Sequence, residues 1–342
     1  MDTPFVSILI PIRNEAAYVE RCLEAVIAQD YPREKMEILV ADGMSDDGTR
    51  EKLLPFLVSY PQVSLLDNPE KFVAPGLNRL ILMAKGDILI RVDGHCVISS
   101  NYVSRCVAHI LEREVDGVGG PMRSIGEDLV SEGIALVMSS KFGVGGSAFR
   151  TETGKTRLVD TVPFPAYTRE IVQKVGLYDE ELVRNQDDEY NYRIRKSGGK
   201  ILLAADVQSE YYTRGTYGKL WRQYFQYGFW KVRVLQKHPR QMSLRQFVPP
   251  IFLLAVDAAV LLTLIFSWGW AALACVTGLY LIAVVMASLL IAAKQGWRFL
   301  GVLLLAFATI HVAYGMGFWV GLFRFWNRWH DQKGRVPEVR FE

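Results

Sequence analysis

The chain contains few cysteines and has a low net charge, and each of these features argues against particular classes of protein. Only 4 of its 342 residues are cysteine, and no two of them form a CxxC pair. Cys22, Cys96, Cys106 and Cys275 lie in predicted helices or at strand ends, so we expect them to be reduced, buried thiols, which argues against both a zinc site and a disulfide framework. The formal net charge is only +3, which argues against nucleic acid as a partner.

Several motifs of common enzymes are also missing. The sequence has no GxGxxG after its first apolar run and no GxxxxGK(S/T) loop, which argues against dinucleotide oxidoreductases and P-loop NTPases. It has no GxSxG elbow and no Ser, His and Asp in a hydrolase order. No signal peptide precedes the first apolar run, so we expect the globular part to stay on the cytoplasmic side.

The first hundred residues contain four apolar runs that alternate with amphipathic segments. The runs Val6–Pro11, Ile38–Ala41, Val63–Leu66 and Ile88–Val92 are typical of buried strands. The segments between them carry apolar residues at helical spacing. This alternation predicts an α/β fold with a Rossmann-like, mostly parallel sheet and right-handed crossovers. Short strands over 117–122, 158–162 and 201–204 are expected further on.

Three of these strands end in polar side chains, at the edge where α/β sheets bind ligands. An aspartate after the second strand can accept hydrogen bonds from a base or ribose, although aspartates are also common at turns and helix caps. An aspartate and a histidine two residues apart can face one divalent cation, and the histidine favours Mn²⁺ over Mg²⁺. An Asx turn is the alternative. The residues concerned are Pro11, Arg13, Asn14, Glu15, Asp42, Asp93 and His95.

A second acidic cluster, Gln186-Asp187-Asp188-Glu189, opens a predicted helix. Part of it is expected to cap the helix, because a helix N-terminus favours acids. Asp187 and Asp188 can also supply a general base for a hydroxyl group. Arg193 on the same helix is a candidate to balance phosphate charge, although a solvated arginine is the ordinary alternative.

The last third of the chain indicates a membrane protein. Residues 216–237 are rich in aromatic and basic side chains, a composition that suits either the membrane interface or a helix packed on the domain. Three apolar segments follow, at about 250–267, 271–293 and 299–323, each near the ~20 residues that a spanning helix needs. We therefore expect a globular domain over 1–215, an interface region over 216–249, membrane helices over 250–323 and a basic tail over 324–342.

The charges near these segments give conflicting predictions of topology. Lys294 and Arg298 bracket the second turn, which places that turn and residues 1–249 inside. Three crossings would then leave the tail outside. Yet Arg324, Arg328 and three further basic residues of the tail favour the inside. Either the third segment does not cross the membrane simply, or the rule that basic residues stay inside fails at the tail.

Taken together, these motifs resemble the GT-A glycosyltransferases of family 2 over roughly residues 5–235. The opening strand and its loop, the segment Asp42–Thr49 and the triplet Asp93-Gly94-His95 resemble the family's nucleotide loop, D-D-G-S-x-D-G-T segment and D-x-D metal motif. The triplet has histidine where the family usually has aspartate. Gln186-Asp187 is in the place of the family's Glu-Asp. The subgroup it looks most similar to is the succinoglycan-type exopolysaccharide glucosyltransferases.

The resemblance implies roles for particular residues. Pro11, Arg13, Asn14, Glu15, Asp42 and Asp93 would bind a nucleoside-diphosphate sugar, with Asp93 and His95 holding Mn²⁺ or Mg²⁺. Asp187 would be the catalytic base. Possible acceptor or diphosphate contacts are Asp188, Arg193, Arg214, Arg222, Gln223 and Trp230, of which Gln223 and Trp230 faintly resemble the Q-x-x-R-W signature of polysaccharide synthases.

The implied function is that of a multi-pass inner-membrane enzyme with a cytoplasmic catalytic domain. It would transfer a sugar from a UDP-linked donor to a lipid-linked saccharide during polysaccharide synthesis, with inversion at the sugar carbon. Two alternatives stay open. One is transfer to a polyprenyl phosphate, for which Arg193, Arg214 and Arg222 would supply the basic residues. The other is a membrane-anchored sensor of sugar nucleotides without turnover. The sequence does not predict an oligomeric state.

Overall fold

A computed structural model describes residues 3–152, 154–213 and 215–338. Contacts between residues divide the chain into two compact units. Unit 1 consists of Met1–Arg123, Ala148–Tyr211 and Lys333–Glu342, and unit 2 of Ser124–Ser147 and Tyr212–Gln332. In sequence, Ser124–Ser147 of unit 2 thus interrupts unit 1, and Lys333–Glu342 of unit 1 follows unit 2. The two units are described separately below.

The largest sheet of unit 1 has the order β3-β2-β1-β4-β9-β6-β10-β8. Its first four strands are parallel neighbours, which confirms the predicted α/β fold. β9 then runs antiparallel to both β4 and β6. The bounds are β1 (Val6–Ile12), β2 (Met36–Asp42), β3 (Val63–Asp67), β4 (Ile88–Arg91), β6 (Gly117–Gly119), β8 (Arg157–Leu158), β9 (Ala166–Thr168) and β10 (Ile201–Leu203).

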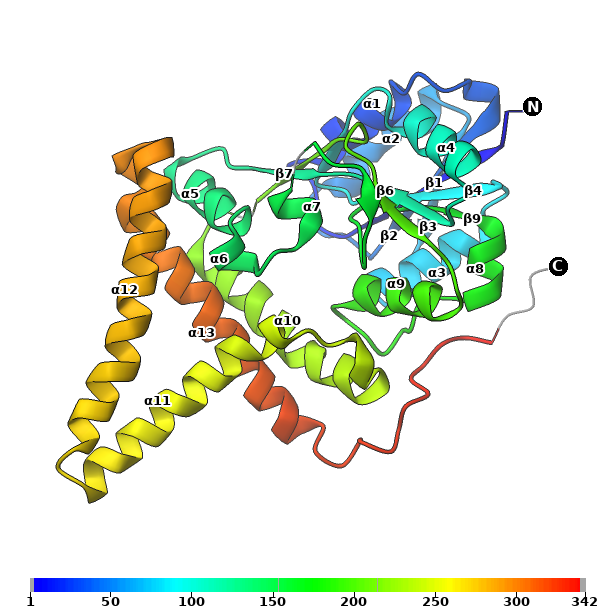
Figure 1. Cartoon of the computed structure of the whole chain (residues 1–342). Coiled ribbons are helices and arrows are strands. Elements are labelled where there is room, and N and C mark those ends of the chain that lie inside the picture. The colour runs from blue at the N-terminus through cyan, green and yellow to red at the C-terminus, as the bar shows by residue number, and fades with distance from the viewer. Residues whose placement is uncertain (1–2, 153, 214, 339–342) are drawn as a thin grey trace. The chain divides into compact units, whose positions relative to one another are not determined.

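Helices cover both faces of this sheet, because alternate side chains of each strand point to opposite sides. Ile8 and Ile10 belong to the core shared with α1, α2 and α4, whereas Leu9 belongs to the core shared with α3, α8 and α9. Figure 1 shows the two helical layers on either side of the strands. The helices are α1 (Val19–Ile27), α2 (Thr49–Ser59), α3 (Val73–Met83), α4 (Tyr102–Arg113), α8 (Arg169–Val175) and α9 (Gln186–Lys196).

The short elements differ most from the sequence expectations. The strand expected over 117–122 is two strands, β6 and β7 (Met122–Ile125), in different sheets. The break falls at Gly120, where an added Cβ would lie 1.4 Å from the carbonyl oxygen of Val207. The strand expected over 158–162 is confined to Arg157–Leu158. β5 (Cys96–Ile98), β11 (Ser209–Tyr212) and α7 (Ala148–Thr151) have too few residues to show a periodic pattern.

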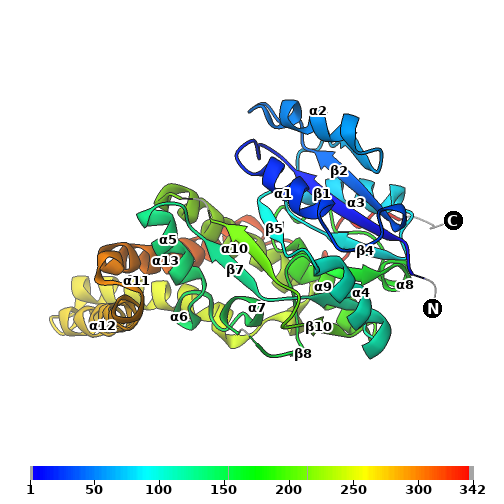
Figure 2. The same ribbon diagram turned by 90° about the horizontal axis from the view of Figure 1, so that it is seen from above.

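Unit 2 is helical over most of its described residues. Three of its helical stretches, Leu244–Ile265, Gly269–Gln295 and Trp297–Arg324, are long and apolar enough to cross a membrane. Figure 2 shows this unit from above, with α5 and α10 beside α13, as their contacts require. The bounds are α5 (Leu129–Met138), α6 (Lys141–Val144), α10 (Tyr217–Lys237), α11 (Val248–Ile265), α12 (Gly269–Gln295) and α13 (Leu300–Arg324).

Candidate active site

The polar residues predicted at the strand ends do meet at one edge of the sheet. β1 lies between β2 and β4, with Ile12 opposite Asp42 and Leu9 opposite Arg91 in the parallel register. From β1 the chain builds outward through β2 and β3 on one side, and then returns to form β4 on the other side of β1. Such a switch point opens a crevice at the carboxyl ends of the strands, where α/β proteins bind ligands.

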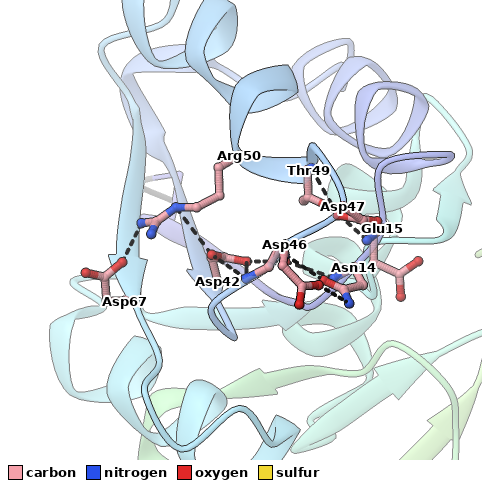
Figure 3. A network of polar contacts seen from close by, with 9 residues as sticks. Asn14, Glu15, Asp42, Asp46, Asp47, Thr49, Arg50 and Asp67 are labelled. Atoms are coloured by element: carbon pink, nitrogen blue, oxygen red, sulfur yellow. Dashed lines mark hydrogen bonds and ion pairs between the residues drawn. The ribbon is translucent and has the colours of Figure 1, made fainter.

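The loops after β1 and β2 are joined by hydrogen bonds through Asn14 (Figure 3). The amide N of Asn14 donates to Ser45 Oγ at 2.9 Å, and its side-chain amide donates to Asp46 Oδ1 at 2.8 Å. The amide N of Asp46 donates back to Asn14 Oδ1 at 3.1 Å. Asn14 has a φ of 56°, a left-handed conformation that asparagine tolerates better than most residues. The two loops therefore form one polar surface above the sheet.

Asp42 lies beneath this surface and is fully buried. Its carboxylate accepts a hydrogen bond from Ser45 Oγ at 2.5 Å and forms an ion pair with Arg50 Nε at 3.3 Å. Arg50 also pairs with Asp67 at the end of β3 (Figure 3). Pro11 is buried, whereas Arg13 is exposed, and the Arg13 side chain lies over Gly43, whose added Cβ would come within 3.0 Å of it.

Arg91 joins the two acidic clusters that the sequence analysis identified separately. Its Nε donates to Asp93 Oδ1 at 2.8 Å, and its Nη1 donates to Asp187 Oδ1. The Arg91 side chain is 8% exposed, Asp93 22% and Asp187 39%. Burial alone would raise the pKa of Asp93, but the charges of Arg91 and His95 and the Arg91 hydrogen bond hold it below its usual value. Asp93 is therefore an anion beside a solvent-accessible Asp187.

Sequence reasoning missed Arg91, although a signal was present. A charged residue inside the apolar run Ile88–Val92 has no place in a buried strand unless acidic partners meet it there. Its partner Asp187 is 96 positions away in the chain, so no local pattern could name it.

His95 is held by Glu15. Its Nδ1 lies 2.9 Å from Glu15 Oε1, and its ring meets that of Tyr211 edge-on at 4.8 Å. A carboxylate on one imidazole nitrogen orients the ring and leaves Nε2 as the ligand nitrogen, as in many metal sites. Among the residues described, no three His, Cys, Asp or Glu side chains gather around a common point that could hold a metal. Asp93 and His95 therefore fit a cation only if it takes its remaining ligands from a bound diphosphate, which is the usual arrangement for Mg²⁺.

The acidic helix α9 is anchored by Arg193. The Arg193 guanidinium donates to Glu189 Oε1 at 2.8 Å and to the carbonyl oxygens of Val175 and Leu177 at 2.6 and 2.8 Å. These bonds tie α9 to the end of α8, so the fold itself accounts for the charge of Arg193. Asp187 occupies the first turn of α9 with its side chain partly open to solvent.

The remaining predicted residues are divided between the two units. Asp188 lies beside Asp187 on α9 and is partly buried. Arg222, Gln223 and Trp230 lie on α10 in unit 2, where Gln223 Nε2 donates to the Tyr227 hydroxyl at 2.9 Å and Trp230 packs on Phe229. Arg214 lies outside the described residues.

Comparison of the sequence with known proteins gives a consistent set of relatives. Residues 7–176 match the model of the family described as "Glycosyl transferase family 2". The succinoglycan biosynthesis protein ExoA of Rhizobium meliloti is 32% identical over 94% of this chain and 96% of its own length. A Methanococcus voltae enzyme, a dolichyl N-acetylglucosaminyl phosphate diacetamido-dideoxy-glucuronosyltransferase, is 30% identical over 68% of this chain and 74% of its own.

Solved structures share the fold at low sequence identity. A mannosyltransferase from Pyrobaculum calidifontis in complex with GDP-mannose and Mn²⁺ aligns with a TM-score of 0.56, at 18% identity, over 91% of this chain and 88% of its own. TarS of S. aureus in complex with UDP-GlcNAc aligns with a TM-score of 0.52, at 16% identity, over 94% and 91% of the two chains.

The mostly parallel sheet, with its polar switch point, is thus the sheet of a GT-A glycosyltransferase. The extent of the sequence match then assigns the family: the chain belongs to glycosyl transferase family 2.

Proposed function

We propose that this enzyme transfers a sugar from a nucleoside-diphosphate donor, UDP-linked, to a lipid-linked saccharide during the synthesis of an extracellular polysaccharide. The observation that carries the proposal is the Arg91 bridge, which places Asp187 beside Asp93 at the switch point of the sheet. Relatives named for succinoglycan biosynthesis and for extending a dolichyl phosphate-linked sugar support the acceptor class.

In this proposal each residue at the sheet edge has a part in binding or in proton transfer. The two loops that Asn14 joins, with Asp42 beneath them, receive the nucleoside, and Arg13 and Glu15 lie on the same loop as Asn14. Asp187 accepts the proton of the acceptor hydroxyl as its oxygen attacks the sugar carbon opposite the leaving diphosphate. Arg91 holds the Asp187 and Asp93 carboxylates close together. Catalysis then rests on positioning and fixed charges, without a covalent intermediate.

Asp93 and His95 would hold a divalent cation. When bound, such a cation offsets the charge that develops on the leaving diphosphate. The cations of two GT-A neighbours, both Mn²⁺, support this class of cofactor. Glu15 would then act by orienting the His95 ring rather than by binding the cation.

Transfer to a polyprenyl phosphate is a weaker proposal. It needs basic side chains available to a second phosphate, and Arg193 is already bonded to Glu189 and two carbonyl oxygens. The deciding experiment offers the purified full-length protein a panel of UDP- and GDP-sugars, with either a lipid-linked saccharide or a polyprenyl phosphate as acceptor. We expect a UDP-sugar to extend the saccharide, detected by mass. Product only on the polyprenyl phosphate would overturn the acceptor, and binding without turnover of any donor would indicate a sensor.

A second experiment tests the cation. We expect EDTA to abolish transfer and Mn²⁺ to restore it at least as well as Mg²⁺, because imidazole prefers the softer metal. His95→Ala should weaken the dependence on cation more than it weakens UDP binding, measured by calorimetry. Full transfer by EDTA-treated protein would contradict the assignment of Asp93 and His95.

A further inference from the structure

We propose that only α11 and α12 cross the membrane, and that α13 lies along the membrane surface on the side of unit 1. The described part of the chain would then cross twice, and its first and last described residues would be on that side. The proposal concerns membrane topology and does not rest on the proposed sugar transfer.

Protein covers the third apolar helix, α13, more extensively than it covers α11 and α12. Within the apolar windows of α11 and α12 only 11% of residues are buried by protein, compared with 39% for the third. Exposed apolar residues of α12 include Leu279, Leu281, Ile282 and Met286, which point in several directions around the helix. Such a surface requires hydrocarbon on most sides. α11 and α12 pack on each other, and their tight turn carries exposed Trp268 and Trp270 and no charge.

The first half of α13 is covered by α5 and α6. Arg298, just before α13, pairs with Glu132 at 3.1 Å, and Val302 fills the space over Gly133. His311 Nε2 lies 3.0 Å from the carbonyl oxygen of Phe142. These contacts run along several turns of α13 rather than at one end.

Chain continuity determines the side on which α5 and α6 lie. They belong to Ser124–Ser147, a stretch that begins directly after unit 1 and returns directly to it. Two crossings would need about 40 apolar residues, at ~20 for each helix, and this stretch has only one apolar helix of 10 residues. α5 and α6 therefore remain on the side of unit 1, and so does the half of α13 that they cover.

α10 runs parallel to α13 and covers it from its first turn to its end. Tyr217 Oη lies 3.4 Å from the carbonyl oxygen of Val302 at one end, and Gln236 Nε2 donates to the carbonyl oxygen of Phe325 at 2.7 Å at the other. α10 carries basic residues along its length: Lys219, Arg222, Lys231, Arg233 and Lys237. Each charge costs roughly 2.5–3.5 kcal/mol at the centre of a membrane helix, so neither α10 nor its companion α13 is expected to cross.

The segment after α13 also stays on this side. Arg233 of α10 is fully buried and donates to the carbonyl oxygens of Arg328 and Asp331. Further on, the amide N of Arg335 donates to Asp179 Oδ1 at 2.8 Å, and the amide N of Glu180 donates to the carbonyl oxygen of Arg335 at 3.0 Å, all within unit 1. The few extended residues between these anchors could not cross a bilayer, because their backbone groups would lack partners in hydrocarbon.

The apolar side chains that α13 exposes are suited to a membrane surface. Its exposed large apolar residues are Leu305, Met316, Val320 and Phe323, which fall on one stripe of the helix. A single apolar stripe on a helix that is otherwise covered by protein can dip into the headgroup boundary. Two crossings also resolve the conflict in the charges, since Lys294, Arg298, Arg324 and Arg328 then share one side, while the uncharged turn at Ser267 lies on the other.

Labelling of introduced cysteines in the full-length protein, in oriented vesicles, tests this topology. The parent carries Cys275→Ser, because Cys275 is the exposed thiol and Cys22, Cys96 and Cys106 are buried. Four probes are then introduced one at a time at exposed positions, which a folded chain should tolerate: Ser59→Cys as the reference on unit 1, Ser267→Cys, Gln295→Cys and Asn327→Cys.

We expect a membrane-impermeant thiol reagent to label positions 59, 295 and 327 from the same side and position 267 from the other. Labelling of position 327 from the side opposite to position 59 would overturn the proposal, because α13 would then cross. Labelling of position 267 from the same side as position 59 would overturn the crossing of α11 and α12. His330→Cys, also exposed, provides a second probe of the tail. The labelling pattern is independent of enzyme activity, so failure here would leave the proposed transfer untouched.

Discussion

At the scale of single residues, Arg91 is the buried side chain that joins the acidic groups of the candidate site. A guanidinium taken out of water is costly unless carboxylates meet it with good geometry. Arg91 has two, one from its own strand and one from α9. The same interaction that stabilises the arginine sets the separation of the proposed cation ligand Asp93 and the proposed base Asp187. Arg91 would thus be a positioning residue, acting through the two acids that it holds.

Replacing Arg91 with methionine should cost stability and activity together. Asp93 would be left as a largely buried charge without its partner, which typically costs about 3–5 kcal/mol. Arg91→Lys restores a charge but cannot bridge two carboxylates with a planar fork. We expect the lysine variant to recover most of the melting temperature while kcat stays low. Recovery of kcat in step with stability would mean that Arg91 serves the fold alone.

Asp187 should matter for turnover and little for donor binding. Asp187→Asn keeps the shape of the side chain but removes its basicity, and loss of a general base typically lowers the rate ~10²–10⁴-fold. UDP binding, measured by calorimetry, should stay close to normal. Asp188→Asn is the matched control on the same helix turn. If the control loses transfer and Asp187→Asn does not, the base has been assigned to the wrong aspartate.

At the scale of elements, α10 and α13 approach closely because glycines line their contact. Gly317 and Gly321 of α13 are one turn apart, and an added Cβ would lie 2.0 Å from the carbonyl oxygen of Phe225 and 2.6 Å from that of Phe229. Gly228 of α10 fits against α13 in the same way, with the carbonyl oxygen of Tyr314 at 2.0 Å. Small residues one turn apart allow backbones to pack at short range.

Gly317→Ala should therefore loosen this pair of helices. The new methyl group must displace backbone, and overpacking of this kind typically costs about 1–3 kcal/mol. Gly301 on the same helix is the control, since an added Cβ there meets nothing within 4 Å. Gly301→Ala should be neutral or stabilising, because alanine favours a helix over glycine by about 1 kcal/mol. Equal melting temperatures of the two variants in detergent would contradict the close contact.

At the scale of the whole molecule, the last segment of the chain returns to the unit that contains the first. The segment that begins at Lys333 belongs to unit 1 although it follows the apolar helices. It is held there by main-chain atoms, through the bonds of Arg335 to Asp179 and Glu180. Val336 lies 4.0 Å from the Cβ position of Gly176, at the end of α8.

Ending the chain at Gln332 should therefore destabilise unit 1. The two hydrogen bonds made by the main chain of Arg335 would be lost, each worth about 0.5–1.5 kcal/mol, and we expect a lower melting temperature. Arg335→Ala is the control, because the bonds are made by its amide and carbonyl groups and should survive the substitution. A loss as large in Arg335→Ala as in the shortened chain would show that the side chain, not the backbone, anchors this segment.

Much of the fold around the candidate site could be predicted from local sequence pattern. The runs that form β1, β2 and β4 are largely apolar, and parallel strands bring their carboxyl ends to one edge. Asp42 and Asp93 could therefore be placed together from the sequence. The three apolar helices were equally evident, since a run of about 20 apolar residues matches the thickness of the hydrocarbon layer of a bilayer.

Contacts between distant segments could only come from the tertiary structure. Arg91 meets Asp187 across 96 positions, and strand or helix periodicity carries no information about such pairs. The partners of α13 cannot be inferred from its composition either, because an apolar helix has the same composition whether lipid or protein covers it. The sequence by itself determined the sheet, its polar edge and the apolar helices. The tertiary structure decided which acids share an arginine, and which apolar helix is shielded by α5, α6 and α10, because both depend on how the chain folds back on itself.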